Sequence, residues 1–150
     1  QNIDRIRTRG GEFDVQWQVL PTLDFTARYI FTDPKITKFA AAPALVGLQL
    51  AQVARHQGML EVAWRPSEGS VVKLTGHAFG SQFDDDQNSR RLGGYATLDL
   101  YAEAAVTGNI SLFINGENLF DRTIEAGRSA DGLVTIGMPR VITGGVRWRL

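Results

Sequence analysis

Apolar and polar residues alternate along most of this chain, and this pattern indicates β-strands with one apolar and one polar face. In residues 12–19 the odd positions Phe13, Val15, Trp17 and Val19 are apolar, whereas the even positions carry acids or amides. Similar alternation gives strands at 6–19, 23–32, 55–65, 72–78, 96–104, 110–115 and 140–150. The chain is therefore predicted to be all-β, an antiparallel meander of about seven strands.

The connections between these strands are short and long in turn. Short ones fall near 20–22, 66–69 and 107–109, and long polar or Gly-rich ones near 33–54, 84–94 and 120–138. In an antiparallel meander this order gathers the short turns at one end and the long loops at the other, as in outer-membrane barrels. Residues 40–54 could form a short helix, but Pro43 and Gly47 interrupt it, so we expect a loop with room for one helical turn.

The three tryptophans provide an independent indication of a membrane. Trp17, Trp64 and Trp148 each fall near the end of a strand that runs towards the short turns, and each lies on the apolar face by parity. They are thus expected at one depth, as an aromatic girdle at a membrane interface. The alternative is three core tryptophans in a soluble sandwich.

The opposite face carries charges of both signs in the middle of strands. These polar positions are Asp14, Arg28, Glu61, Lys73, Asp99, Glu103, Asn115, Arg147 and Arg149. Such side chains stay solvated in a wide wet barrel or against a polar plug but could not fill a dry core. An exposed face of a soluble sheet would look the same, so this feature alone does not discriminate.

Composition excludes several classes of protein. With 43% hydrophobic residues and no run of about 18 apolar residues, a transmembrane helix is excluded. Sixteen basic and sixteen acidic residues cancel, which gives no indication of nucleic-acid binding. There is no cysteine for a disulfide or thiolate site. The first residues lack the apolar core of a signal peptide, so an export signal is expected upstream.

Candidate chemistry is sparse, and we expect neither an enzyme nor a cofactor or metal. His56 and His77 lack acidic neighbours in sequence and are expected to be structural or solvated. Asn118 and Asp121 are expected to bond to the backbone, as in an Asx turn.

The candidate ligand contacts lie in the second long loop. The run Asp84-Asp85-Asp86 resembles a calcium loop, but it lacks the Gly and Glu spacing of an EF-hand. We expect a solvated outer loop in which these three aspartates, with Arg90 and Arg91, are candidates for contact with a substrate.

Several short motifs together carry a family resemblance that covers essentially the whole chain. They are Arg9-Gly10-Gly11-Glu12, Leu20-Pro21, Arg55-His56, Gly94-Tyr95-Ala96-Thr97-Leu98-Asp99, Glu117-Asn118-Leu119-Phe120-Asp121, Gly137-Met138-Pro139-Arg140 and Gly144-Gly145-Val146-Arg147-Trp148-Arg149-Leu150. With them the chain resembles the C-terminal barrel region of TonB-dependent outer-membrane transporters. Such proteins usually end on Phe or Trp, whereas this sequence ends on Leu150.

The resemblance implies a barrel of about 22 strands with a plugged lumen. Residues 1–150 would be its C-terminal segment, without the plug and the N-terminal barrel strands. The implied function is TonB-energised import of a scarce bulky nutrient, such as an iron–siderophore or cobalamin, across the outer membrane of a Gram-negative-type cell. Its partners would be the lipid bilayer, the missing strands and plug, TonB through that plug, and the ligand. The alternatives are a passive porin or small structural barrel, and a soluble β-sandwich binding module.

Overall fold

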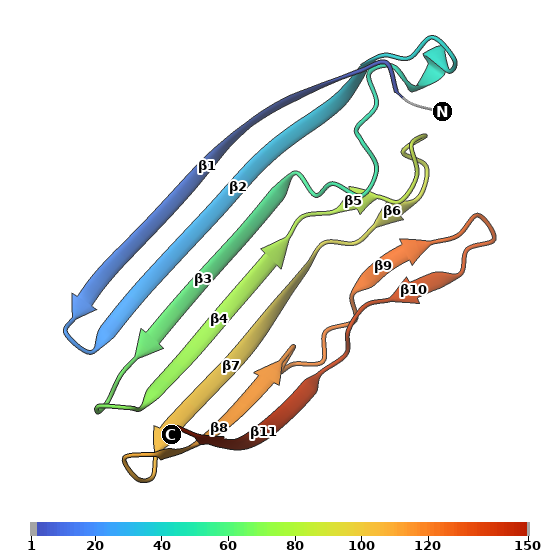
Figure 1. The fold of residues 1–150 in the computed structure, drawn as a ribbon. Coiled ribbons are helices and arrows are strands. Elements are labelled where there is room, and N and C mark those ends of the chain that lie inside the picture. The colour runs from blue at the N-terminus through green and yellow to red at the C-terminus, as the bar shows by residue number, and fades with distance from the viewer. Residues whose placement is uncertain (1–2, 150) are drawn as a thin grey trace.

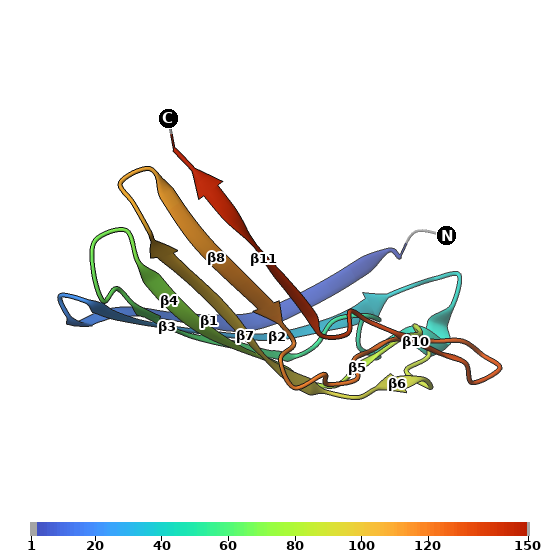
Figure 2. The same ribbon diagram turned by 90° about the horizontal axis from the view of Figure 1, so that it is seen from below.

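The computed structural model describes residues 3–149, and Leu150 lies outside them. These residues form one curved seven-stranded antiparallel sheet, with two small hairpin sheets beyond one end (Figures 1 and 2). The large sheet contains, in spatial order, β1 (Arg5–Leu20), β2 (Leu23–Lys38), β3 (His56–Trp64), β4 (Val71–Phe79), β7 (Tyr95–Ala105), β8 (Ile110–Glu117) and β11 (Val141–Trp148). The predicted all-β meander of seven strands is confirmed.

Short turns and long loops occupy opposite ends of the sheet, as the sequence predicted. The turns after β1, β3 and β7 lie together at one end in Figure 1, and the loops after β2, β4 and β8 lie at the other. The loops also contain strands that the sequence did not predict. These pair as β5 (Gln82–Phe83) with β6 (Arg91–Leu92), and as β9 (Glu125–Arg128) with β10 (Val134–Ile136).

The strand β2 continues well beyond the predicted boundary at residue 32. Its extension pairs with the start of β1, so that Arg9 lies opposite Asp33 and Arg7 lies opposite Lys35. Backbone pairing does not require an apolar side chain. Beyond residue 32 one side of β2 carries the charged Asp33 and Lys35, whereas Pro34 and Ile36 on the other side are buried. At residue 33 the apolar positions therefore change from one side of the strand to the other, and the strand does not end there.

The register fixes which side chains share a face, because residues directly opposite each other in an antiparallel pair lie on the same side. One row across the sheet pairs Trp17 with Phe25, then Val62, Leu74 and Leu100 in turn. The same pairings carry Phe13, Val15, Leu60, Trp64, Leu98, Leu112, Val146 and Trp148 onto this face. We call this side the outward face. The prediction that the alternating strands place their apolar residues on one face is confirmed.

The tryptophans are exposed on the outward face. Trp17 is 61%, Trp64 49% and Trp148 69% exposed, near the ends of β1, β3 and β11 that lead to the short-turn edge. In this sheet they are not core residues. The arrangement is the one that the sequence predicted from parity and strand direction.

The opposite, inward face is polar and carries ion pairs between neighbouring strands. Arg28 Nε lies 2.6 Å from Asp14 Oδ2. His77, which has no acidic neighbour in sequence, has its Nε2 3.4 Å from Asp99 Oδ2. His56 lies on the outward face instead, where its Nδ1 is 2.7 Å from the hydroxyl of Tyr29. Both histidines thus have structural contacts.

A small hydrophobic core lies at the loop end of β2. Ile36 is fully buried and packs with Phe39 and Leu45, the last residue of the 3₁₀ turn η1 (Pro43–Leu45). The loop that the sequence predicted over 40–54 thus contains a single helical turn. In residues 3–149 no helix is long and apolar enough to cross a membrane.

The Asn-Leu-Phe-Asp segment after β8 is a turn whose side chains form hydrogen bonds that position the last long loop. Asn118 is buried with a left-handed φ of 49°, and its amide donates to the carbonyls of Arg122 (2.9 Å) and Met138 (3.3 Å). Its side-chain oxygen accepts the Arg122 N–H at 2.8 Å. Asp121 in turn accepts the Arg140 N–H at 2.9 Å. The predicted side-chain bonding to the backbone is confirmed, and it reaches residues about twenty positions away.

Replacing Leu100 by Arg is expected to impair assembly of the larger membrane barrel that the family resemblance implies. An Arg on the lipid face in mid-bilayer costs about 2–4 kcal/mol, whereas one on the wet face costs far less. The matched control is Thr97→Arg, on the inward face of the same strand opposite His77. Heat-modifiable gel mobility measures the folded fraction, and equal folding of the two variants would contradict the assigned faces.

Replacing Asn118 by Ala is expected to lower the free energy of unfolding by roughly 2–3 kcal/mol, since it removes three hydrogen bonds to the backbone of Arg122 and Met138 and forces Ala into a left-handed conformation. Asn118→Asp keeps the acceptor but loses the donors, so its loss should be intermediate. Asn109→Ala, in an exposed short turn, serves as the control. Denaturant unfolding of the full-length protein gives the three free energies of unfolding. An unchanged value for Asn118→Ala would show that these hydrogen bonds do not stabilise the turn.

Candidate functional site

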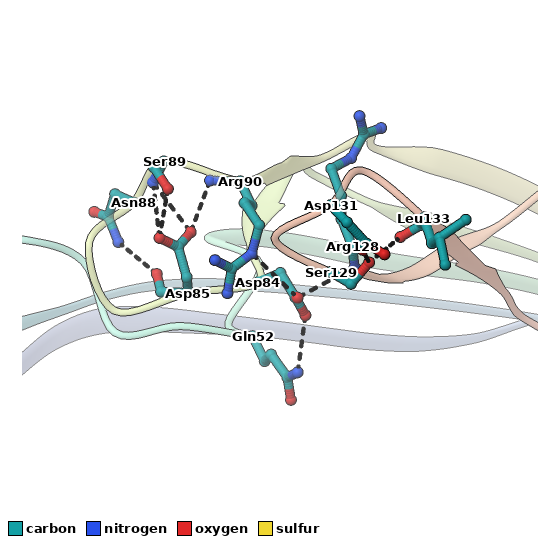
Figure 3. A network of polar contacts seen from close by, with 10 residues as sticks. All are labelled: Gln52, Asp84, Asp85, Asn88, Ser89, Arg90, Arg128, Ser129, Asp131 and Leu133. Carbon is teal, nitrogen blue, oxygen red and sulfur yellow. Dashed lines mark hydrogen bonds and ion pairs between the residues drawn. The ribbon is translucent and has the colours of Figure 1, made fainter.

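The three long loops meet at Asp84, which joins them through one carboxylate (Figure 3). Gln52, from the first loop, donates from Nε2 to Asp84 Oδ1 at 3.1 Å. The backbone N–H of Arg128, from the third loop, donates to Oδ2 at 3.1 Å, and Arg90 Nε lies 3.8 Å from the same oxygen. Segments far apart in sequence are therefore fixed relative to one another at the loop end of the sheet.

Asp85 holds the tip of the second loop together. Its carboxylate is buried and accepts hydrogen bonds from the N–H groups of Ser89 (3.0 Å) and Arg90 (2.7 Å) and from the Ser89 hydroxyl (2.7 Å). Burial alone would raise the pKa of this carboxyl, but these hydrogen bonds and the charge of Arg90 outweigh it and hold the pKa below its ordinary value. The ionised carboxylate is thus the form that the loop stabilises.

Two further contacts tie the loops together. The Asn88 side chain accepts the Gln49 N–H at 2.9 Å and donates to the Gln49 carbonyl at 2.8 Å, so it pairs with the first loop as a backbone strand would. Glu125, in β9, accepts the Gly93 N–H at 2.9 Å and pairs with Arg128 at 3.0 Å. The Gly93 hydrogen bond and the Arg128 charge lower the pKa of Glu125 against the effect of burial.

The five predicted ligand contacts divide into internal and exposed groups. Asp84 and Asp85 bond mainly to other loop residues, and Arg90 lies beside Asp84. Asp86 and Arg91 are exposed at the loop surface, where the Arg91 guanidinium donates to the Ser81 hydroxyl at 2.9 Å. The structure brings all five residues into one loop cluster, in which Asp84, Asp85 and Arg90 hold the loops together. Their contact with a ligand stays a prediction.

A pocket of about 290 Å³ opens between the first two loops and the sheet. Its lining consists of Gln52, Ala54, Gln57, Phe79, Gly80, Gln82, Gly93 and Tyr95. The rings of Phe79 and Tyr95 stack with centroids 5.1 Å apart. Amide groups beside an aromatic pair suit a ligand with uncharged polar groups and a flat apolar part.

The sequence reasoning missed this pocket, although a signal for it existed. Gln57, Phe79 and Tyr95 lie opposite one another in neighbouring strands, on the inward face and next to the long loops. Alternation and loop position could have identified that row. Within residues 3–149, no three His, Asp or Glu side chains come close enough to hold a metal ion.

The family model and the relatives that match this chain belong to the same family of proteins. The family model described as TonB dependent receptor-like, beta-barrel, matches residues 1–119. The metal-pseudopaline receptor CntO of Pseudomonas aeruginosa is 26% identical over 151 residues, covering 95% of this chain and 21% of that protein. The ferrichrome outer membrane transporter/phage receptor of Escherichia coli is 29% identical over 127 residues, 78% of this chain and 16% of that protein. The chain thus spans about a fifth of the length of these relatives.

Solved structures share the fold. The ferric yersiniabactin uptake receptor FyuA of Yersinia pestis matches with a TM-score of 0.84 and 19% identity, over 95% of this chain and 23% of that one. The siderophore receptor PiuA of Acinetobacter baumannii matches with a TM-score of 0.82 and 18% identity, over 95% and 22%. At this identity the likeness concerns the fold: the sheet corresponds to part of a much larger barrel.

Acidification is expected to loosen the tip of the second loop through Asp85. Its pKa in the folded chain lies below the ordinary 3.8, so its ionised form stabilises the loop above pH 3.8, and this stability is lost as the pH falls through the folded-state value. Hydrogen exchange of the Ser89 and Arg90 amides in the full-length protein should show falling protection in that range. Asp85→Asn cannot ionise, so an equal acid dependence in this variant would assign the effect to another group.

Proposed function

Since the chain belongs to the TonB-dependent receptor β-barrel family, we propose that it forms wall and outer loops of an outer-membrane active transporter energised through TonB. Members of this family are transporters and receptors, not enzymes. The observation that carries the proposal is the amphipathic sheet, whose exposed apolar face runs across β1–β11 while loops interlock at one end. A soluble sandwich would bury that face.

The proposed cargo is a scarce, bulky nutrient such as an iron–siderophore complex or cobalamin. The names of the relatives support a metal complex as the cargo: CntO is a metal-pseudopaline receptor, and the Escherichia coli protein is a ferrichrome outer membrane transporter/phage receptor. Ligand capture would involve the exposed Asp86 and Arg91 and the pocket beside Phe79 and Tyr95. Asp84, Asp85 and Arg90 would act by keeping these loops in place.

The remaining barrel strands and plug are proposed as partners of this sheet. In the described residues, β1 and β11 each pair along one edge only, and unpaired strand edges do not occur in a lipid-exposed barrel wall. We propose that residues 1–150 are the C-terminal segment of the barrel, in the outer membrane of a Gram-negative-type cell. Trp17, Trp64 and Trp148 would form its girdle at the short-turn interface.

Uptake by cells tests this function and separates it from a passive porin. Cells that lack the full-length gene are supplied with radiolabelled ferric siderophores or with labelled cobalamin. Restoring the full-length protein should restore uptake of a probe, and only when TonB is present. Uptake that persists without TonB would indicate passive diffusion. The variant Tyr95→Ala should raise the KM by roughly tenfold for the imported probe, about the 1–3 kcal/mol that one lost pocket contact costs, and Tyr29→Ala on the outward face is its control.

A further inference from the structure

Basic side chains gather on the outward face just beyond its apolar band. On β2 the outward positions run from Leu23 to Phe31 and then continue with Asp33 and Lys35. On β1 the same face passes from Phe13 through Gly11 to Arg9 and Arg7. Apolar side chains thus give way to charged ones at the same level on two neighbouring strands.

The height of this change matches a membrane interface. From Leu23 to Phe31 the strand rises about 27 Å at about 3.4 Å per residue. A tilt of roughly 40° reduces this to about 21 Å, close to the apolar band of about 25 Å in outer-membrane barrels. Tyr29, Phe31 and His56 form an aromatic cluster at the upper limit, with Phe31 and His56 centroids 5.2 Å apart. The basic residues above them therefore lie at headgroup level on the long-loop side.

The basic cluster, which consists of Arg7, Arg9, Lys35 and Arg55, has a surplus of positive charge. Its one carboxylate partner, Asp33, is 3.4 Å from Lys35 Nζ and 2.5 Å from Arg55 Nη2. Arg7 and Arg9 are exposed, and among residues 3–149 neither makes an ion pair. Guanidinium groups present forked donors that suit phosphate oxygens. A cationic surface directly above an apolar one fits an anionic amphiphile.

We propose that Arg7, Arg9, Lys35 and Arg55 bind the phosphate groups of anionic lipids in the outer leaflet. The acyl chains of such a lipid would cover the apolar residues below, and its phosphates would meet the basic cluster. Lys35 and Arg55 are held in place by Asp33, whereas the side chains of Arg7 and Arg9 are exposed and make no ion pair within residues 3–149. The inference rests on the membrane location in the proposed function but is independent of the cargo.

The test uses the full-length receptor in micelles of a neutral detergent, titrated with diphosphorylated lipid A and followed by native mass spectrometry. One basic residue near an anionic surface contributes a factor of about five in affinity. The double variant Arg7→Gln/Arg9→Gln leaves the Asp33 ion pairs intact and should weaken binding about 25-fold. Arg28→Gln/Lys73→Gln removes the same charge from the inward face and should bind as the wild type does.

Two further ligands identify the source of the phosphate. Dephosphorylated lipid A should bind the wild type as weakly as it binds the double variant, and inorganic phosphate should not displace the lipid. Equal affinity of the wild type for both lipids, unchanged binding by the double variant, or displacement by inorganic phosphate would each overturn the inference. If the wild-type protein supports no TonB-dependent uptake, the proposed function fails instead. The two failures are therefore distinguishable.

Discussion

The backbone hydrogen-bond ladder of the seven strands is the constraint on which the other features depend. In an antiparallel ladder a shift of one residue exchanges the two faces of a strand. Here such a shift in β3 would move Glu61 to the apolar side and Val62 to the polar one. The continuous register from β1 to β11 therefore allows one face to be apolar and the other to carry ion pairs.

The two faces differ in chemistry, as expected if the outward face meets lipid and the inward face meets water. Outward side chains such as Leu60 and Val146 remain more than half exposed, as side chains that face lipid do. Inward side chains find partners on neighbouring strands, for example Glu103, which is buried and pairs with Arg147 and Arg149. Such ion pairs place opposite charges beside each other on a face that forms no dry core.

The loops reach their arrangement by a different kind of interaction. Carboxylates and amides accept or donate hydrogen bonds to backbone groups of other loops, with Asp84, Asn88 and Glu125 as the main connections. Each contact supplies a partner to an N–H group that has none in a strand ladder. The pocket beside Phe79 and Tyr95 is bounded by these loops, so the polar bridges also determine the shape of the surface offered to a ligand.

The sequence by itself determined the number of strands in the large sheet, their two faces, the level of the tryptophans and the separation of turns from loops. Alternation is a local property, readable from residues two positions apart, so Trp17 and Trp64 could be assigned a face without any structure. The tertiary structure alone decided the pairing of β5 with β6 and of β9 with β10, the His77–Asp99 contact and the internal use of Asp84 and Asp85. Asp84 contacts residues 32 and 44 positions away. Bonds between side chains and distant backbone groups have no periodic signature, and only the folded chain brings their partners together.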